Sequence, residues 1–370
     1  MVNGKFELTD EIINKARASI SNLADNLIKL KMEDIESYEF PLDEKFALEI
    51  IHEDAPFYLI IKFASTNKNI ICMAPGAFRR DKVTSDGKPI DPPHFHRWRW
   101  PELFDESVIV FADPMIFWDD NISIGWMIGD ANQWYIETLS EIIKKLAKNQ
   151  NVINDNILFF GSSGGGFISV CLATLIKHSK VLVNNSQFSI LNYKQHLVKR
   201  ALDLITPKFD GLTQEEVIEK IKYRIDTPEL FKRENYAPYI TYYVNVKSEI
   251  DIQDHSIPLI QDHFNQDQFK GLDVIFYSED KEIPHHPFKA GLMMKVIDLF
   301  AKNNLYNSEP NVEERIILRD RYQGNCKYTF EKLKEENEEL KKKNLEMETS
   351  TSWKITAPLR KIMRKIRRKN

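Results

Sequence analysis

The sequence predicts an α/β protein in which helices cover both faces of a mostly parallel β-sheet. Short β-like apolar runs alternate with segments of helical periodicity along most of the chain, which is the pattern of parallel strands joined by helical crossovers. The chain has 370 residues, 42% of them hydrophobic, so it can bury a sizeable core. Its three cysteines (Cys72, Cys171 and Cys326) are too few and too scattered for a disulfide framework or a cysteine-based zinc site.

The predicted elements begin with a helix over residues 9–31, where apolar residues recur at helical spacing after Thr9, a candidate N-cap. The β-like runs that follow lie at residues 46–51, 57–64, 69–74, 107–112, 156–160, 180–184, 240–246 and 272–277. Further helical patterns lie at residues 132–148, 166–177, 213–223, 256–268 and 287–302. Residues 186–236 are polar and helical, and they are too long for a simple crossover. We therefore expect a helical insertion that caps one edge of the sheet.

We expect the chain to be organised in consecutive segments with different roles. An N-terminal helical segment (1–40) precedes an α/β catalytic domain (41–305), and a linker follows (306–329). The chain then continues as a short coiled coil (330–350) and a basic amphipathic tail (351–370). No internal repeat is visible, so the large α/β domain is expected to carry the chemistry.

No segment is predicted to cross a membrane or to direct export. Residues 157–176 carry no charge and have the length of a membrane span, but a Gly-Ser-Ser-Gly-Gly-Gly turn at 161–166 divides them into two short apolar pieces. The N-terminus carries acidic residues where a secretory signal would need a basic region. We therefore expect a cytoplasmic protein.

The strongest chemical signal is a glycine-rich turn between the strand candidate 156–160 and the helix candidate 166–177. The pentapeptide GSSGG at 161–165 fits G-x-S-x-G, in which glycines relieve the crowding around a serine in a tight strand-to-helix turn. The helix that follows directs free N–H groups at the reacting oxygen. The pattern predicts Ser163 as a nucleophile and Gly164 as an oxyanion-hole donor. A phosphate-binding or purely structural turn is the alternative, although a P-loop is excluded because no Lys-Ser/Thr follows.

With this turn the chain resembles the α/β-hydrolases, in which the serine is followed along the chain by an acid and then by a histidine, each after a later strand. The resemblance implies a serine–histidine–acid triad that works through an acyl-enzyme. It also implies a second oxyanion-hole donor from the loop after an early strand. The segment Ala-Pro-Gly-Ala-Phe at 74–78 follows the strand candidate 69–74, so the N–H of Gly76 or Ala77 is expected to fill that role.

The acid and the base are predicted from their places after two later strand candidates. Asp251 is our choice of acid, with Asp254 and Glu249 as alternatives in the same loop. His285 and His286 stand side by side after the next strand candidate, and the sequence does not separate them. No partners are identifiable that would make this pair a metal site. We expect neither a metal nor a cofactor.

Residues 93–100 concentrate aromatic and basic side chains in one loop (Pro-His-Phe-His-Arg-Trp-Arg-Trp). Aromatic faces beside arginine donors suit a sugar ring or an anionic substrate, and a locally packed aromatic loop is the alternative. We take Arg97 and Trp98 from this loop as candidate substrate-binding residues. Trp126, in the segment Gly-Trp-Met-Ile-Gly-Asp that is expected on the same edge of the sheet, is the third.

The C-terminal part of the chain differs from the body in charge and in periodicity. Residues 354–370 hold eight Lys/Arg and no acid, which leaves residues 1–353 with 43 Lys+Arg against 55 Asp+Glu, a net charge of −12. Over residues 330–347, apolar residues and asparagines recur at intervals of three and four, as in a two-stranded coiled coil. A single solvated helix is the alternative. We expect this coil to form a homodimer or to dock on a glycosyltransferase.

The basic tail is expected to bind an anionic membrane surface. Pro358 can open a helix that places Leu359, Ile362 and Ile366 on one face among Lys and Arg, which is typical of a peripheral membrane anchor. The acidic body and this apolar face make nucleic acid a poorer partner. Basic residues near such a surface contribute up to about 1 kcal/mol each. The full chain should therefore bind anionic liposomes at low salt, and residues 1–350 should not; equal binding would refute the anchor.

A second resemblance concerns the string SWKITAPLR at 352–360, which is similar to segments that end many bacterial glycosyltransferases and other proteins of surface-polysaccharide assembly. The body, over about residues 45–300, resembles α/β-hydrolase-like proteins of bacterial capsule and surface-glycan biosynthesis, including the accessory secretion acetyltransferase-like group. Together the resemblances imply a bacterial enzyme at the inner face of the membrane, an esterase or deacetylase acting on an acylated carbohydrate. A carbohydrate O-acyltransferase with the same triad is the first alternative, and a non-catalytic scaffold for glycan assembly is the second.

Overall fold

The structure is a computed structural model that describes residues 7–78, 90–265 and 269–302, together with residues 338–339, 342–343 and 346. The chain divides into two compact units, Met1–Glu309 and Pro310–Asn370. The described residues of the second unit are helical and exposed, and Lys343 Nζ lies 3.9 Å from Glu339 Oε2. The predicted linker, the apolar positions of the predicted coiled coil and the basic tail lie outside the described residues.

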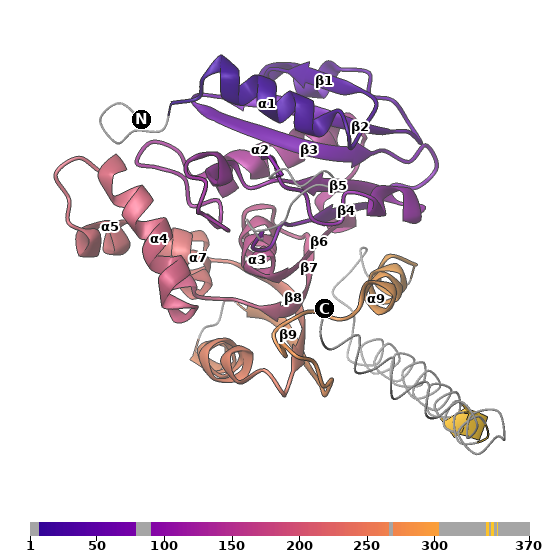
Figure 1. Ribbon diagram of the computed structural model, residues 1–370, viewed down its shortest axis with the longest axis vertical. Coiled ribbons are helices and arrows are strands. Elements are labelled where there is room, and N and C mark those ends of the chain that lie inside the picture. Colours follow the sequence, from indigo (N-terminus) through magenta and orange to yellow (C-terminus); the bar gives the residue numbers. More distant parts are fainter. Residues whose placement is uncertain are drawn as a thin grey trace, which may run out of the picture. The chain divides into compact units, whose positions relative to one another are not determined.

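A nine-stranded sheet forms the centre of the first unit (Figure 1). In spatial order its strands are β1 (Leu27–Leu30), β2 (Lys45–His52), β3 (Ala55–Lys62), β5 (Ser107–Phe111), β4 (Ile70–Met73), β6 (Ile157–Ser163), β7 (Lys180–Ser186), β8 (Ala237–Asn245) and β9 (Phe269–Tyr277). β3 runs antiparallel to both of its neighbours, and all other neighbouring strands are parallel. The predicted α/β class with a mostly parallel sheet is confirmed for the described residues of this unit.

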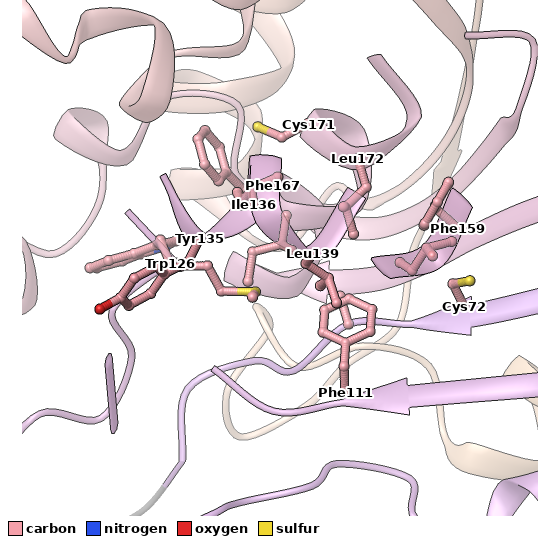
Figure 2. Packing of buried hydrophobic residues seen from close by; sticks show 14 of the residues in the cluster. Cys72, Phe111, Trp126, Tyr135, Ile136, Leu139, Phe159, Phe167, Cys171 and Leu172 are labelled. Carbon is pink, nitrogen blue, oxygen red and sulfur yellow. The ribbon is translucent and has the colours of Figure 1, made fainter. Parts of the chain in front are cut away.

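Helices cover both faces of this sheet because its strands are apolar on both sides. On one face, α2 (Tyr135–Asn149) and α3 (Gly164–Leu175) pack with alternate strand residues into one continuous core, part of which Figure 2 shows. On the other face, α1 (Asp10–Ile20) meets β2, where Arg17 donates two hydrogen bonds to Glu49 at 2.6 and 2.8 Å. Along β2, Glu49 lies between Leu48 and Ile50, which belong to the core just described, so the Glu49 side chain points to the opposite face of the sheet.

The uncharged stretch 157–176 is divided at its glycine-rich turn, as predicted: β6 occupies its first part and α3 its second. Within the described part of the chain, no helix is both long enough and apolar enough to cross a membrane. The remaining elements outside the insertion are η1 (Met32–Ser37), η2 (Trp100–Leu103), η3 (Pro114–Phe117), η4 (Asn154–Asn156), the π-helical turn η7 (Asp251–Ser256), α8 (Ile257–Asn265) and α9 (Ala290–Lys302).

Helices take the place of a simple crossover between β7 and β8, as expected for residues 186–236. They are α4 (Gln195–Ile205), α5 (Gln214–Lys220), α6 (Lys222–Ile225) and α7 (Thr227–Glu234), with 3-10 turns at η5 (Ile190–Asn192) and η6 (Thr206–Lys208). α5 begins with a capping box, in which Thr213 and Glu216 exchange side-chain-to-backbone hydrogen bonds. Val217, Leu230 and Phe231 are fully buried, so the insertion is packed as part of the core.

The N-terminal segment differs from the predicted continuous helix over 9–31. α1 ends at Ile20, and Leu27–Leu30 instead form β1, which lies parallel to β2 with Leu27 opposite Ala47. The apolar spacing of residues 27–30 fits a helical turn and a short edge strand equally well, and only the pairing with β2 decides between them. Residues 1–40 are therefore not a separate helical segment but part of the unit that contains the sheet.

Candidate active site

Ser163 occupies the turn between β6 and α3 in a backbone conformation that few residues adopt. Its φ is 56° and its ψ is −130°, close to a region populated almost only by glycine. The surroundings enforce this conformation, because a Cβ on Gly161 would lie only 2.1 Å from the Gly165 carbonyl oxygen. The glycines of the G-x-S-x-G pattern are therefore required by the close passage of the chain through the turn.

The loop after β4 lies against this turn. A Cβ on Gly165 would come within 2.7 Å of the Pro75 carbonyl oxygen, and a Cβ on Gly76 would lie 3.6 Å from the Ser162 carbonyl oxygen. The first turn of α3 and the loop after β4 therefore meet beside Ser163. The predicted oxyanion-hole residues are all on these two segments: Gly164, Gly76 and Ala77.

Three side chains from separate loops form a hydrogen-bonded chain at the turn. His285 Nε2 lies 2.8 Å from Ser163 Oγ, and His285 Nδ1 lies 2.9 and 2.8 Å from the two carboxylate oxygens of Asp251. A carboxylate only accepts hydrogen bonds, so Nδ1 carries the proton and Nε2 accepts from the serine hydroxyl. At these distances an imidazole can take the proton of a nucleophile.

The structure also places the residues that the sequence could not rank. Asp251 is fully buried and contacts His285, whereas Asp254 and Glu249 are exposed. His286 is exposed as well, and its ring lies outside the hydrogen-bonded chain. Of the alternatives, Asp251 and His285 are therefore the two that belong to the hydrogen-bonded chain.

Asp251 stands at the start of the π-helical turn η7, where other groups hold it. Its Oδ2 accepts a hydrogen bond from Ser248 Oγ at 2.5 Å, and its backbone carbonyl accepts one from Ser256 Oγ at 2.7 Å. His255 in the same turn is buried, and this burial lowers its pKa to about 4, so the ring is neutral at neutral pH. Asp251 therefore faces His285 without a second cation from this turn.

Two asparagines at the ends of neighbouring strands anchor the loop that carries His285. Asn185 Nδ2 lies 3.0 to 3.4 Å from three successive backbone carbonyl oxygens, those of residues 284–286. Asn245 Nδ2 donates to two carbonyl oxygens of the same loop at 2.9 and 3.1 Å. Neither residue was predicted from the sequence, although a polar side chain at the carboxyl end of a buried strand is a usable signal.

Two further side chains, both from the 186–236 insertion, contact Ser163 Oγ and His285 Nε2. Gln187 Nε2 donates to Ser163 Oγ at 3.3 Å, and the Tyr193 hydroxyl lies 3.3 Å from His285 Nε2. Burial raises the pKa of Tyr193, so its hydroxyl keeps its proton. Neither residue was predicted from the sequence, because contacts between segments far apart in the chain leave no local pattern.

Asp113 holds the loop that packs on the other side of the turn. It is buried and accepts backbone hydrogen bonds, among them those from Gly125 at 2.8 Å and Met127 at 3.3 Å. Burial raises the pKa of Asp113 to about 6, even though these hydrogen bonds favour the charged form. The loop brings Trp126 against α3, where a Cβ on Gly164 would lie 2.8 Å from the indole nitrogen.

Arg97, a candidate substrate-binding residue, links the two segments that meet at the turn. Its Nη2 donates to Ser162 Oγ at 3.0 Å, and its Nη1 donates to the Ala74 carbonyl oxygen at 3.3 Å. The guanidinium also lies over the rings of Trp100 and Phe160, at 5.4 and 4.9 Å from their centroids. Burial lowers the pKa of Arg97 to about 10, so the group remains a cation. Through these contacts, Arg97 holds the end of β6 and the loop after β4 together.

The two candidate tryptophans lie in different places. Trp126 is fully buried behind the turn, and its indole nitrogen donates to Gln187 Oε1 at 2.7 Å. Trp98 instead lies beside Lys45 and Arg99, at 5.1 and 4.7 Å from its ring centroid. Lys45 begins β2, which runs in the same direction as β6, so it lies at the opposite edge of the sheet from the turn. The structure does not bring Trp98 to the site.

A hollow of about 220 Å³ lies between the loop at 121–124 and helix α4. It is lined by Asn121, Ile122, Ser123, Ile124, His196, Leu197 and Arg200. The Phe78 N–H donates to the Ser123 carbonyl oxygen at 2.8 Å, which joins this rim to the loop after β4. Across the described residues, no three His, Cys, Asp or Glu side chains are grouped as metal ligands would be.

No protein-family model matches the chain, and no curated protein matches it in sequence. Among solved structures, it is similar to the capsule O-acetyltransferase of Neisseria meningitidis serogroup A, with a TM-score of 0.45 and 13% identity over 62% of this chain and 88% of that one. Acetyl xylan esterase 1 from Thermoanaerobacterium sp. JW/SL YS485 has a TM-score of 0.44 and 13% identity, over 83% of this chain and 96% of that one. The chain is also similar to the glycosylation-associated protein (Gap123) complex from Streptococcus agalactiae. The TM-score is 0.47 and the identity 13%, over 70% of this chain and 47% of that chain.

Proposed function

We propose that the protein is a serine-dependent carboxyl-ester hydrolase in which Ser163 is the nucleophile, His285 the base and Asp251 the residue that orients the base. The observation that carries this proposal is the hydrogen-bonded chain from Ser163 Oγ through His285 to Asp251, with a distance of 2.8 Å on each side of the imidazole. The φ of 56° at Ser163 is a second, independent argument, because strain of this kind is retained where a turn must present a nucleophile.

In the first half of the proposed reaction, Ser163 Oγ attacks the ester carbonyl carbon while its proton passes to His285 Nε2. The carbonyl electron pair moves onto the oxygen, where backbone N–H groups of Gly164 and of Gly76 or Ala77 stabilise it. Each such donor typically contributes about 3 kcal/mol. The intermediate then re-forms the carbonyl and breaks the bond to the leaving alcohol, which takes the proton from His285.

In the second half, water attacks the acyl-enzyme as His285 accepts one of its protons. The tetrahedral intermediate collapses, Ser163 recovers the proton and the carboxylic acid is released. Asp251 keeps the imidazole in the required tautomer throughout and stabilises it whenever it is charged. Its full burial and its second hydrogen bond from Ser248 suit this orienting role.

We propose an acylated carbohydrate of bacterial surface-polysaccharide biosynthesis as the substrate. The hollow beside α4 combines amide, hydroxyl, imidazole and guanidinium groups with three aliphatic side chains. This mixture suits a sugar, which has polar edges and apolar faces. The tail resemblance at residues 352–360 supports the same class of substrate. Membrane docking through residues 354–370 is a separate proposal, which the liposome comparison described above tests independently of catalysis.

One observation favours acyl transfer to a carbohydrate hydroxyl as a second candidate function. The Tyr193 hydroxyl lies 3.3 Å from His285 Nε2, in the region that a deacylating water would have to enter. The His285 side chain is only 12% exposed, so the insertion already limits the access of water. An acyl-enzyme shielded from water in this way would transfer its acyl group more readily to a carbohydrate hydroxyl than to water, because the bound carbohydrate contributes binding energy.

Labelling with a fluorophosphonate serine probe tests the proposed function. We expect the probe to modify Ser163, identified by mass spectrometry of the labelled peptide, and expect Ser163→Ala to abolish labelling. Ser169→Ala is the matched control, since it removes a buried hydroxyl from α3, the helix that follows Ser163, and should leave labelling unchanged. Folded wild-type protein that resists the probe would contradict the proposal and favour the non-catalytic scaffold.

A further inference from the structure

We infer that the side-chain amide of Gln187 is a catalytic hydrogen-bond donor to the reacting oxygen of Ser163, and that Trp126 fixes the orientation in which it donates. This inference rests on the proposed function and adds a residue to it, because the oxyanion hole proposed above consists of backbone N–H groups. Gln187 follows β7 directly, at the carboxyl end of the strand beside β6, and it is fully buried.

The chemistry of its two neighbours determines which end of the amide faces which group. The Trp126 indole nitrogen lies 2.7 Å from Gln187 Oε1, and an indole N–H can only donate, so the oxygen end must face Trp126. The nitrogen end then faces Ser163, with Nε2 3.3 Å from Oγ. If the amide were turned over, two buried donors would oppose each other at 2.7 Å.

The rest of the residue is held as firmly as the amide. The Gln187 N–H donates to the Ser163 carbonyl oxygen at 3.2 Å, and β7 is paired with β6 up to Ser163 and Ser186. Trp126 is fully buried in the loop that Asp113 organises. Donors that are fixed before the reaction begins cost no reorganisation when charge develops.

The hydrogen bonds around Ser163 Oγ are mutually compatible. The hydroxyl donates its proton to His285 and accepts a hydrogen bond from Gln187, so the two neighbours do not compete. As His285 takes the proton, negative charge builds on Oγ, and the amide N–H stabilises it. The same contact acts in deacylation, when Oγ leaves the second tetrahedral intermediate and recovers its proton from His285. No covalent bond of Gln187 forms or breaks.

The first test removes the donor but keeps the shape of the side chain. We expect Gln187→Met to lower the second-order rate constant of fluorophosphonate labelling, and kcat for p-nitrophenyl acetate, by about 10²-fold, the usual effect of losing one such donor. KM should change little, since the contact is to the nucleophile and not to the substrate. Thermal unfolding of the variant shows whether the fold is retained.

The second test changes the protonation state of the group that faces Ser163. In Gln187→Glu, the carboxyl group can still accept from Trp126, but its other oxygen donates to Ser163 only while it is protonated. The ratio of variant to wild-type labelling rates should therefore fall at least about tenfold between about pH 5 and pH 10, as the buried carboxyl ionises. A ratio that is constant with pH would overturn the inference, and this test does not depend on Gln187→Met being well folded.

A double-mutant cycle tests the orienting role of Trp126. Trp126→Phe removes the indole N–H, so the amide can turn over and the labelling rate should fall. In the Gln187→Met background, the same change should have little further effect, since no amide remains to be oriented. Additive losses would contradict the assigned role of Trp126.

The outcomes separate this inference from the function on which it rests. If wild type is labelled at Ser163 and folded Gln187→Met reacts within about twofold of wild type, the role of Gln187 is wrong and the proposed function stands. If folded wild type is not labelled at all, the proposed function fails and this inference fails with it.

Discussion

Replacing His285 with alanine is expected to lower both the labelling of Ser163 and the turnover of an acetyl ester by about 10⁴-fold or more. A serine hydroxyl is a weak nucleophile until a base accepts its proton, and the proposed base, His285 Nε2, lies 2.8 Å from Oγ. The measurement compares fluorophosphonate labelling rates and p-nitrophenyl acetate turnover for variant and wild type at equal concentrations of folded protein.

His286→Ala is the matched control for this prediction. The two histidines are adjacent in the sequence, but the ring of His286 is exposed and lies outside the hydrogen-bonded chain. We expect the control to retain activity within about twofold of wild type, as for an exposed side chain without a partner in the reaction. Loss of activity in His286→Ala with retention in His285→Ala would overturn the assignment of the base.

Gly161→Ala is expected to be the most destabilising single substitution at the turn. The added Cβ would lie 2.1 Å from the Gly165 carbonyl oxygen and 2.7 Å from the Gly166 nitrogen, both of which are backbone atoms at the start of α3. Neither can move without displacing the helix that is packed across the core. We expect a loss of at least about 3 kcal/mol in the free energy of unfolding, or failure to fold, measured by urea denaturation.

Gly291→Ala provides the comparison for the glycine substitution. A Cβ at Gly291 meets no atom within 4 Å apart from its chain neighbours and the nearby backbone of its own helix, α9. Because alanine is the better helix former, we expect its unfolding midpoint to equal or slightly exceed that of wild type. If Gly161→Ala were as stable as Gly291→Ala, the account of the turn as a sterically forced conformation would be wrong.

Local periodicity predicted the main strands of the sheet because each is apolar over enough residues to be distinguished from a helix. The runs that form β5, β6 and β9 are continuous or alternating apolar segments between turn signals, so each was found within a few residues of its bounds. Leu27–Leu30 forms a strand that local periodicity did not predict. Four residues are too few to distinguish a helical turn from an edge strand, and the partner strand lies far along the chain.

The candidate site was predictable to the extent that its residues stand in motifs. Ser163 is flanked by the glycines that its conformation requires, so a sequence pattern marks it. Gln187 and Tyr193 carry no such mark, because only the pairing of β7 with β6 and the packing of the insertion bring them to the turn. Trp98 shows the reverse error: its composition suits a binding site, but the strand direction of β2 places it at the far edge.

By itself the sequence determined the α/β fold class, the glycine-enforced turn at Ser163 and the loops in which an acid and a histidine would be found. These are consequences of local apolar patterning and of backbone sterics, which act over a few residues. Only the tertiary structure places His285 and Asp251, and not their neighbours, in the hydrogen-bonded chain, and only it brings Gln187 to Ser163. Those choices depend on which side chain faces inward from a loop and on which strands lie side by side, and both are settled by packing between segments far apart in the chain.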